Sequence, residues 1–322
     1  MQETVCVIIA AKDAAATIGA AVRSALDQAQ VTRVVVVDDA STDATAQSAT
    51  EAAEGDARLS ILRCVVNRGP AAARNLAIAE SEEALIAILD ADDSFLPGRF
   101  DRLLSITDWD MVADNVAFVH HTNVEVDRPG GGSSFRLTAT EFVRGNISRP
   151  GLARGEFGFL KPVVRRSFLE SHDLAYDESI RLGEDYDLYL RMLLAGARFA
   201  VVGDCGYRAL VRANSLSGQH STTDLQRLAE VDHRALRRDD LDAGLRSALR
   251  DHLSQANAKF HHRRFLDERR ARGLGAALGQ MGSSLEVWQS VVGGILRDKL
   301  AGLRPRRPGA IPSVRYLLDR QG

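Results

Sequence analysis

The chain has 322 residues, of which 45% are hydrophobic and 26% are charged, and its formal net charge at pH 7 is −2. This is the composition of an ordinary soluble globular protein, long enough for one large α/β domain with an appendage or for two domains. The small net charge argues against a nucleic-acid-binding protein that relies on a global positive field.

The cysteine content and the length of the apolar segments indicate the cellular compartment in which the protein is expected. Cys6, Cys64 and Cys205 lie far apart and form no CxxC pair, which favours small core residues in a reducing compartment over a disulfide framework or a zinc site. Strand-like sequence begins within five residues of the N-terminus, so we expect no signal peptide. The uninterrupted apolar segments are too short to span a bilayer. We therefore expect a cytoplasmic protein.

Short apolar runs alternate with helical patterns through the first ninety residues. The runs at residues 5–10, 34–37, 59–66 and 85–89 predict buried strands. Apolar residues at helical spacing after the first strand, a polar helix start at residues 41–43 and an Ala-rich stretch at 71–81 predict the intervening helices. This alternation predicts a doubly wound α/β fold, with a mostly parallel sheet covered on both faces.

Polar residues follow three of these predicted strands, at the edge where open α/β sheets bind ligands. They are Asp38 and Asp39, then residues 67–69, then Asp90, Asp92 and Asp93. The last three carboxylates would repel one another unless a cation lay among them, and oxygen ligands suit Mg²⁺ or Mn²⁺. Asp-x-Asp alone is equally typical of a solvated acidic turn. The convergence of three polar strand ends favours a binding site.

A strongly apolar helix is predicted from Glu184 onward, and acidic residues occupy its first turn. These acids either complement the helix macrodipole or include a carboxylate general base at the wall of a crevice. No G-x-G-x-x-G follows the first strand, where residues 10–13 read AAKD instead, so a dinucleotide-binding fold is disfavoured.

The composition shifts to charged, Ala- and Leu-rich helical sequence from about Thr223. We therefore divide the chain into a first domain, residues 1–220, and a helical C-terminal extension, residues 221–322. Its last predicted helix has an apolar stripe followed by basic residues. The stripe contains Leu285, Trp288, Val291, Val292, Ile295, Leu296, Leu300 and Leu303, and the basic residues are Arg297, Lys299, Arg304, Arg306 and Arg307. Such a stripe is either a core contact or an interfacial membrane helix.

Five segments, taken together, resemble the family 2 glycosyltransferases with a GT-A fold. In order they are VCVIIAAKDAAATIGAAVRSAL, VVVVDDASTDAT, NRGPAAARNLAI, ILDADDSFLP and LGEDYDLYLRMLLAG, and they cover roughly residues 4–217. The phrases DMVADN, GFLKPVVRRSFLE and YDESIRLGEDYDLYL are similar to the bacterial exopolysaccharide branch of that family, including the succinoglycan-type glucosyltransferases.

The resemblance implies roles for seven residues. Four residues are expected to bind the nucleotide-sugar. Asp39 accepts a hydrogen bond from the base, and Arg74 lies near the nucleotide. Asp90 contacts the ribose, and Glu184 forms part of the site wall. Asp92, with Asp93, is expected to hold Mn²⁺ or Mg²⁺ on the diphosphate. Asp185 matches the catalytic base.

These roles describe one reaction. A divalent ion neutralises the diphosphate leaving group, and a carboxylate takes the proton of a weakly nucleophilic acceptor hydroxyl. One displacement inverts the anomeric centre, and the missing Q-x-x-R-W signature indicates a non-processive enzyme. The resemblance thus implies transfer of a hexose, such as glucose, from a nucleoside-diphosphate sugar to a growing, lipid-linked exopolysaccharide. We expect a cytoplasmic enzyme, peripheral at the inner membrane through its C-terminal helix, and no nucleic-acid partner.

Two alternatives and one departure from the family pattern remain. The family usually has Pro-Ala-Tyr-Asn after the first strand, whereas the AAKD here leaves only the Lys12 stem to cover the base. A non-catalytic, nucleotide-sugar-binding assembly protein would not need Asp90, Asp92 and Asp185 together. A sugar nucleotidyltransferase would usually carry a Gly-rich, basic phosphate loop, which AAKDAA is not.

Overall fold

The computed structural model describes residues 3–121, 124–127, 134–148, 155–211, 220–303 and 313–318. Strands and helices alternate in its N-terminal part, as predicted. They are β1 (Val5–Ala11), α1 (Ile18–Leu26), β2 (Val31–Asp39), α2 (Thr45–Ala52), β3 (Leu59–Cys64), α3 (Pro70–Ala79) and β4 (Leu85–Ile88). β3 ends two residues before the predicted end, because Val65 and Val66 leave the sheet and are exposed.

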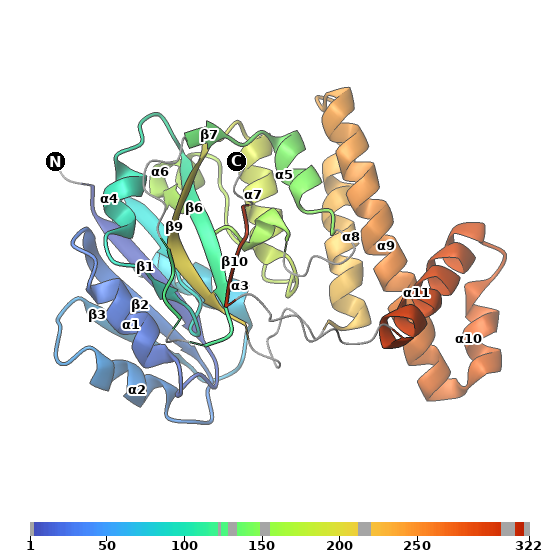
Figure 1. Cartoon of the computed structure of the whole chain (residues 1–322), viewed down its shortest axis with the longest axis horizontal. Helices are drawn as coiled ribbons and strands as arrows, with labels where there is room; N and C mark the ends of the chain where they lie inside the picture. Colours follow the sequence, from blue (N-terminus) through green and yellow to red (C-terminus); the bar gives the residue numbers. More distant parts are fainter. Residues whose placement is uncertain are drawn as a thin grey trace.

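The first four strands form the parallel, doubly wound half of one large sheet (Figure 1). β1 and the second half of β2 are buried on both faces, as their unbroken apolar runs require. The sheet order is β3-β2-β1-β4-β8-β6-β9-β5, so the strands that follow β4 continue from its free edge. The carboxyl ends of β2 and β4 therefore lie at the same edge of the sheet.

The second half of the sheet is mixed. Its elements are β5 (Ser94–Phe95), α4 (Arg99–Leu104), β6 (Met111–Val119), β7 (Ser134–Arg136), α5 (Ala139–Gly145), η1 (Phe157–Phe159), β8 (Val163–Arg165), α6 (Arg166–Ser171), α7 (Glu184–Leu194) and β9 (Phe199–Leu210). β8 is antiparallel to both β4 and β6, whereas β6 and β9 are parallel. The three-residue strand β8 thus joins the two halves.

The C-terminal extension is helical, as predicted, and then returns to the sheet. Its elements are α8 (Thr222–Leu236), α9 (Ala243–Arg272), α10 (Leu274–Met281), α11 (Leu285–Leu303) and β10 (Val314–Tyr316). α8 and α9 pack beside α5 and α7, and Leu245, Ala248 and Leu249 of α9 share the main core with the sheet (Figure 1). β10 pairs antiparallel with β6.

The apolar stripe of α11 is divided between a core and the surface. Val291 is buried and Ile295 half-buried in a small second core with Phe265 of α9 and Met281 of α10, away from the sheet. The other members whose side chains are described are exposed: Leu285, Trp288, Val292 and Leu296. The side chains of Leu300 and Leu303 and the basic run at 304–307 lie outside the described part of the chain. Among the described helices, none is both long and apolar enough to cross a membrane.

Candidate active site at the carboxyl edge of the sheet

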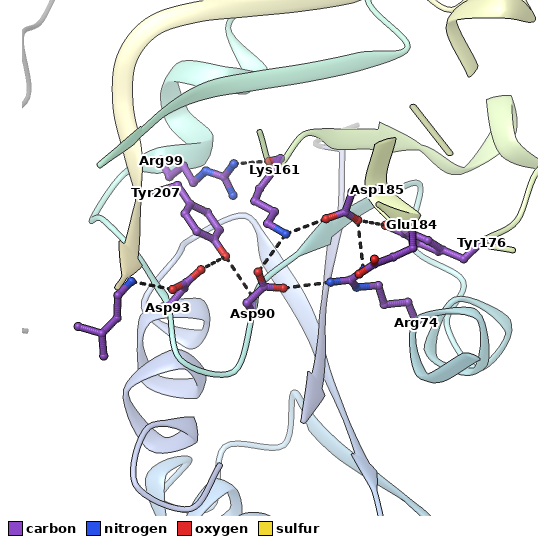
Figure 2. A network of polar contacts seen from close by, with 10 residues as sticks. Arg74, Asp90, Asp93, Arg99, Lys161, Tyr176, Glu184, Asp185 and Tyr207 are labelled. Atoms are coloured by element: carbon purple, nitrogen blue, oxygen red, sulfur yellow. Dashed lines mark hydrogen bonds and ion pairs between the residues drawn. The ribbon is translucent and has the colours of Figure 1, made fainter. Parts of the chain in front are cut away.

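The chain turns sharply acidic where β4 ends, and the N-terminus of α7 faces this point across a buried cluster of charges (Figure 2). Asp90 follows β4, Glu184 and Asp185 open α7, and Arg74 comes from α3. Four of the seven residues predicted from sequence are therefore in direct contact, although more than ninety positions separate Asp90 from Asp185.

Arg74 links the two acidic segments. Its Nη1 donates to Glu184 Oε1 at 2.9 Å and to Asp185 Oδ1 at 3.2 Å, and its Nη2 donates to Asp90 Oδ1 at 3.1 Å. The side chain is only 5% exposed. α3 places it there because Pro70 occupies the first turn and the Ala-rich face of the helix packs against the sheet.

Lys161 forms a second link that the sequence had not indicated. Its Nζ lies 2.8 Å from Asp185 Oδ2 and 3.0 Å from Asp90 Oδ2, and the side chain is 7% exposed. The backbone of Lys161 is itself fixed, because its carbonyl accepts a hydrogen bond of 2.5 Å from Arg99 Nη2. Arg99 is buried in an ion pair with Asp114. Lys161 therefore belongs to the rigid interior rather than to a surface loop.

The cations keep the central carboxylate ionised. Burial alone would raise the pKa of Asp90, but the charges of Lys161 and Arg74 lower it to about 2. For Lys161, burial would lower the pKa, yet Asp185 and Asp90 raise it overall, so the ammonium stays charged. Burial raises the pKa of Glu184 despite the opposing charge of Arg74. The site is thus an array of alternating charges that is buried except for Asp90, whose side chain is 35% exposed.

Two tyrosines complete the cluster, and neither was predicted. The Tyr176 hydroxyl donates to Asp185 Oδ1 at 3.2 Å, while its ring lies below the Arg74 guanidinium. The Tyr207 hydroxyl of β9 accepts from the Asp90 backbone N–H at 3.1 Å and donates to Asp93 Oδ2 at 2.8 Å. Lys161 and Tyr176 lie in phrases that resemble the exopolysaccharide branch, but no residue pattern there assigns them to the site, and Tyr207 lies in no such phrase.

Asp92 and Asp93 differ in their surroundings. Asp93 is buried, and both its oxygens accept hydrogen bonds from β9, from the Tyr207 hydroxyl and from the Leu210 N–H at 2.8 Å (Figure 2). Burial, followed by the charges of Asp90 and Asp92, raises the pKa of Asp93 well above its usual value. Asp92 is partly exposed.

The donor atoms at this strand end fit a hard cation. Within the described residues, no three His, Cys, Asp or Glu side chains form a cage for a metal ion. Mg²⁺ rarely requires such a cage, because one or two carboxylates together with substrate phosphates and water complete its shell. A partly exposed Asp92 beside Asp90 offers that kind of all-oxygen ligand set.

Asp39 lies outside the charge cluster and fixes the loop before α3. Its Oδ1 accepts from the Arg68 N–H at 2.8 Å, and its Oδ2 accepts from the Gly69 N–H at 2.7 Å. Gly69 has φ +92°, so a side chain there would be strained. Nearby, Lys12 Nζ donates to the Ala40 carbonyl at 2.8 Å, which lays the lysine stem toward the end of β2.

Sequence comparison connects this arrangement with known proteins. The family model described as "Glycosyl transferase family 2" matches residues 6–170. "Succinoglycan biosynthesis protein ExoU" of Rhizobium meliloti (strain 1021) is 46% identical over 98% of this chain and 95% of its own length. "Succinoglycan biosynthesis protein ExoO" of the same strain is 36% identical over 83% of this chain and 74% of its own length.

Solved structures share the fold. S. aureus TarS (residues 1–349) in complex with UDP-GlcNAc superposes with a TM-score of 0.58 over 90% of this chain and 79% of that one, at 20% identity. Mannosyltransferase PcManGT from Pyrobaculum calidifontis, in complex with GDP-Man and Mn²⁺, gives a TM-score of 0.58 over 95% of this chain and 82% of that one, at 18% identity. These similarities confirm the predicted GT-A fold.

Proposed function

Because the chain belongs to glycosyl transferase family 2, we propose that it is an inverting, metal-dependent, non-processive enzyme of exopolysaccharide synthesis. It moves a hexose, such as glucose, from a nucleoside-diphosphate sugar to a growing, lipid-linked glycan. Its similarity to two succinoglycan biosynthesis proteins supports the exopolysaccharide assignment. Family membership disfavours the nucleotidyltransferase alternative.

The observation that carries the proposal is the contact between Asp90 and Asp185 through Arg74 and Lys161. Asp90 belongs to the donor-binding strand end, and Asp185 opens the helix on the opposite wall. A non-catalytic sugar-nucleotide carrier would have no need of a buried carboxylate on the acceptor side, because burying such a group has a desolvation cost. A transferase needs both carboxylates within one site.

In the proposed reaction, the acceptor oxygen attacks the anomeric carbon of the donor while Asp185 receives the hydroxyl proton. The new C–O bond forms as the bond to the diphosphate breaks, and the electron pair leaves with the diphosphate oxygen. Arg74 and Lys161 hold the base in place before this step and present positive charge to the donor side. One displacement by one base inverts the configuration.

Donor recognition falls to the strand ends. Each Asp39 oxygen retains a lone pair beyond its backbone partner, so the carboxylate can accept from a nucleotide base while the Lys12 stem covers it. Asp90 contacts the ribose, and Glu184 shapes the wall. Asp92 is the better placed metal ligand, because it is partly exposed whereas Asp93 is buried. When bound, Mn²⁺ or Mg²⁺ neutralises charge developing on the diphosphate.

Donor binding provides the first test. We expect thermal stabilisation of the purified protein by one member of a panel of UDP- and GDP-sugars in Mn²⁺ or Mg²⁺, and loss of that stabilisation in EDTA. Asp92→Asn should lose the metal-dependent part, since it removes a negative oxygen ligand. Equal donor binding with and without chelator would contradict metal dependence.

The base is tested by Asp185→Asn. We expect turnover of the same donor to fall by roughly 10² or more, while donor affinity survives, because the amide cannot accept the acceptor proton. If Asp185 served only as a structural partner of Arg74 and Lys161, the change would lower stability and leave turnover of the folded enzyme intact. A variant that transfers sugar at the wild-type rate would disprove the assignment.

A further inference from the structure

The face of α7 turned away from the active site is tied to the C-terminal extension by a buried polar chain. The Tyr186 hydroxyl donates to Asp232 Oδ1 of α8 at 2.7 Å. The other oxygen of Asp232, Oδ2, lies 2.6 Å from His252 Nδ1 of α9. Asp232 is completely buried, and Tyr186 and His252 are nearly so. None of these residues touches the charge cluster around Asp90 directly.

Packing alone does not account for the hydrogen-bonded series Tyr186–Asp232–His252, referred to below as the polar chain. The Tyr186 ring already stacks on Phe142 of α5 at 5.6 Å and lies 4.6 Å from the His252 ring of α9, so ring contacts join α7 to α5 and α9 without the carboxylate. A fully buried carboxylate carries a desolvation penalty, and replacing such polar groups with apolar residues of similar volume is often neutral or stabilising. What the hydrogen bonds add is direction, because they fix where the Tyr186 side chain points.

The neighbouring residues of α7 are held from the same side. Arg234 of α8 donates to Asp187 Oδ1 at 3.1 Å. Gly183, with φ +77°, begins the helix so close to α8 that a Cβ there would lie 2.8 Å from Leu228 Cδ1. The first turn of α7 is therefore fixed by α8 at its N-cap, Gly183, and at its third and fourth residues, Tyr186 and Asp187.

These contacts determine the direction of Asp185. Consecutive residues of a helix are rotated by about 100° about its axis, so holding Tyr186 and Asp187 sets the rotation of the whole turn. Asp185 is the residue before Tyr186 and points into the charge cluster, toward Lys161 and Arg74. Catalytic groups need placement within about 0.5 Å, and a misplacement near 1 Å can cost about 10² in rate.

We propose that Asp232, backed by His252, is a positioning residue for the reaction: through Tyr186 it sets the rotation of α7 that aims Asp185 at the acceptor. This inference rests on the proposed role of Asp185 as the base. It assigns to α8 and α9 a part in catalysis although they line no part of the charge cluster.

The sharpest variant is Tyr186→Phe, which removes one hydroxyl and keeps the ring stack and the Asp232–His252 pair. With UDP-glucose, UDP-GlcNAc and GDP-mannose as donor probes, we expect kcat to fall about 10-fold and the donor KM to stay unchanged. Tyr186→Phe/Asp232→Leu, which leaves no tyrosine hydroxyl or carboxylate unpaired, should fold and show the same loss. His252→Asn, which can still donate to Asp232, should retain more activity than His252→Leu.

Leu249→Ala is the matched control, because Leu249 is fully buried in the same helical layer and makes no part of the polar chain. It should lower the melting temperature without changing kcat of the folded enzyme. If Tyr186→Phe likewise lowers only the melting temperature, the polar chain has a purely structural role and the inference is wrong.

A crystal structure of Tyr186→Phe separates failure of this inference from failure of the proposed function. We expect the first turn of α7 to rotate and Asp185 to leave hydrogen-bond distance of Lys161. An unchanged Asp185 would overturn the positioning role, whatever Asp185 does in catalysis. A displaced Asp185, together with a fully active Asp185→Asn enzyme, would instead show that Asp185 is not the catalytic base.

Discussion

Lys161 is the residue on which the two walls of the site depend. Its ammonium is almost completely buried between a carboxylate that follows β4 and one that opens α7. Without it, the carboxylates of Asp90 and Asp185 would have only Arg74 between them. Buried ion pairs contribute little net stability when formed, but removal of one partner is strongly destabilising, because it leaves a charge without compensation.

We therefore predict that Lys161→Met lowers the free energy of unfolding by roughly 3–5 kcal/mol. Lys161→Arg keeps the charge and should lose less, although its planar guanidinium cannot reproduce both contacts. Urea denaturation of the three proteins measures the effect. Equal midpoints for the methionine variant and the wild type would show that the ammonium does not stabilise the cluster.

The site residues that sequence could predict are those with a strong local signal. Asp90 stands at the end of an unbroken apolar run, and Glu184 and Asp185 open an amphipathic helix, so motif and periodicity agree. Lys161, Tyr176 and Tyr207 carry no comparable signal, because each enters the site through chain crossings that only the folded sheet creates. Lys161 arrives there because the chain re-enters the sheet at β8, between β4 and β6.

Helices and strands likewise differ in how well the sequence predicts them. The four parallel strands could be predicted because each is a buried apolar run followed by a helix or a polar turn. β8 and β10 could not, since each has three residues and a strand of that length shows no periodicity. The stripe of α11 was recognised, but its division between a small core and an exposed face depends on α9 and α10, which sequence does not place.

The exposed face of the α10–α11 pair has the features of a membrane contact. Leu274 and Leu278 of α10 are exposed, as are Leu285, Trp288, Val292 and Leu296 of α11. The adjoining sequence is rich in arginine, including Arg269, Arg270 and Arg272 at the end of α9. Apolar side chains beside basic ones suit the interface of an anionic leaflet, where each basic residue contributes about 1 kcal/mol that salt screens.

We predict that the full chain co-sediments with phosphatidylglycerol-containing liposomes, less so at high salt and not with neutral ones. Leu285→Ser/Val292→Ser/Leu296→Ser should abolish binding and remain folded, since these side chains are exposed. Val291→Ala, in the small core, should reduce stability but retain binding. Binding of the triple variant at the wild-type level would show that the contact lies elsewhere.

At the scale of the molecule, the helical extension and the sheet are interwoven. We propose that residues 1–220 and 221–322 are two functional units. The first carries out catalysis, and the second stabilises the first and provides the membrane contact. Physically, α8 and α9 contribute to the main core, and β10 completes the sheet beside β6. Leu317 is buried there, and the Asn115 side chain exchanges hydrogen bonds with the backbone of Leu318.

A chain that stops at residue 312 loses the half-buried strand β10 together with the buried Leu317. We predict a lower melting temperature and concentration-dependent aggregation, because the second half of β6 regains a free edge. Leu317→Ala, which keeps the backbone pairing, should lower stability by roughly 2–5 kcal/mol without aggregation. Light scattering and thermal melts distinguish the two, and a monodisperse truncated chain would contradict the role given to β10.

The return of β10 also sets the order of events on the ribosome. β6 ends at Val119, whereas its partner Val314–Tyr316 is synthesised almost 200 residues later. During elongation, which proceeds at about 5–20 residues per second, the nascent sheet must carry an open edge until the β10 segment is synthesised. A stalled or prematurely terminated polypeptide would thus display this edge, which gives quality-control chaperones a means of recognising an unfinished copy.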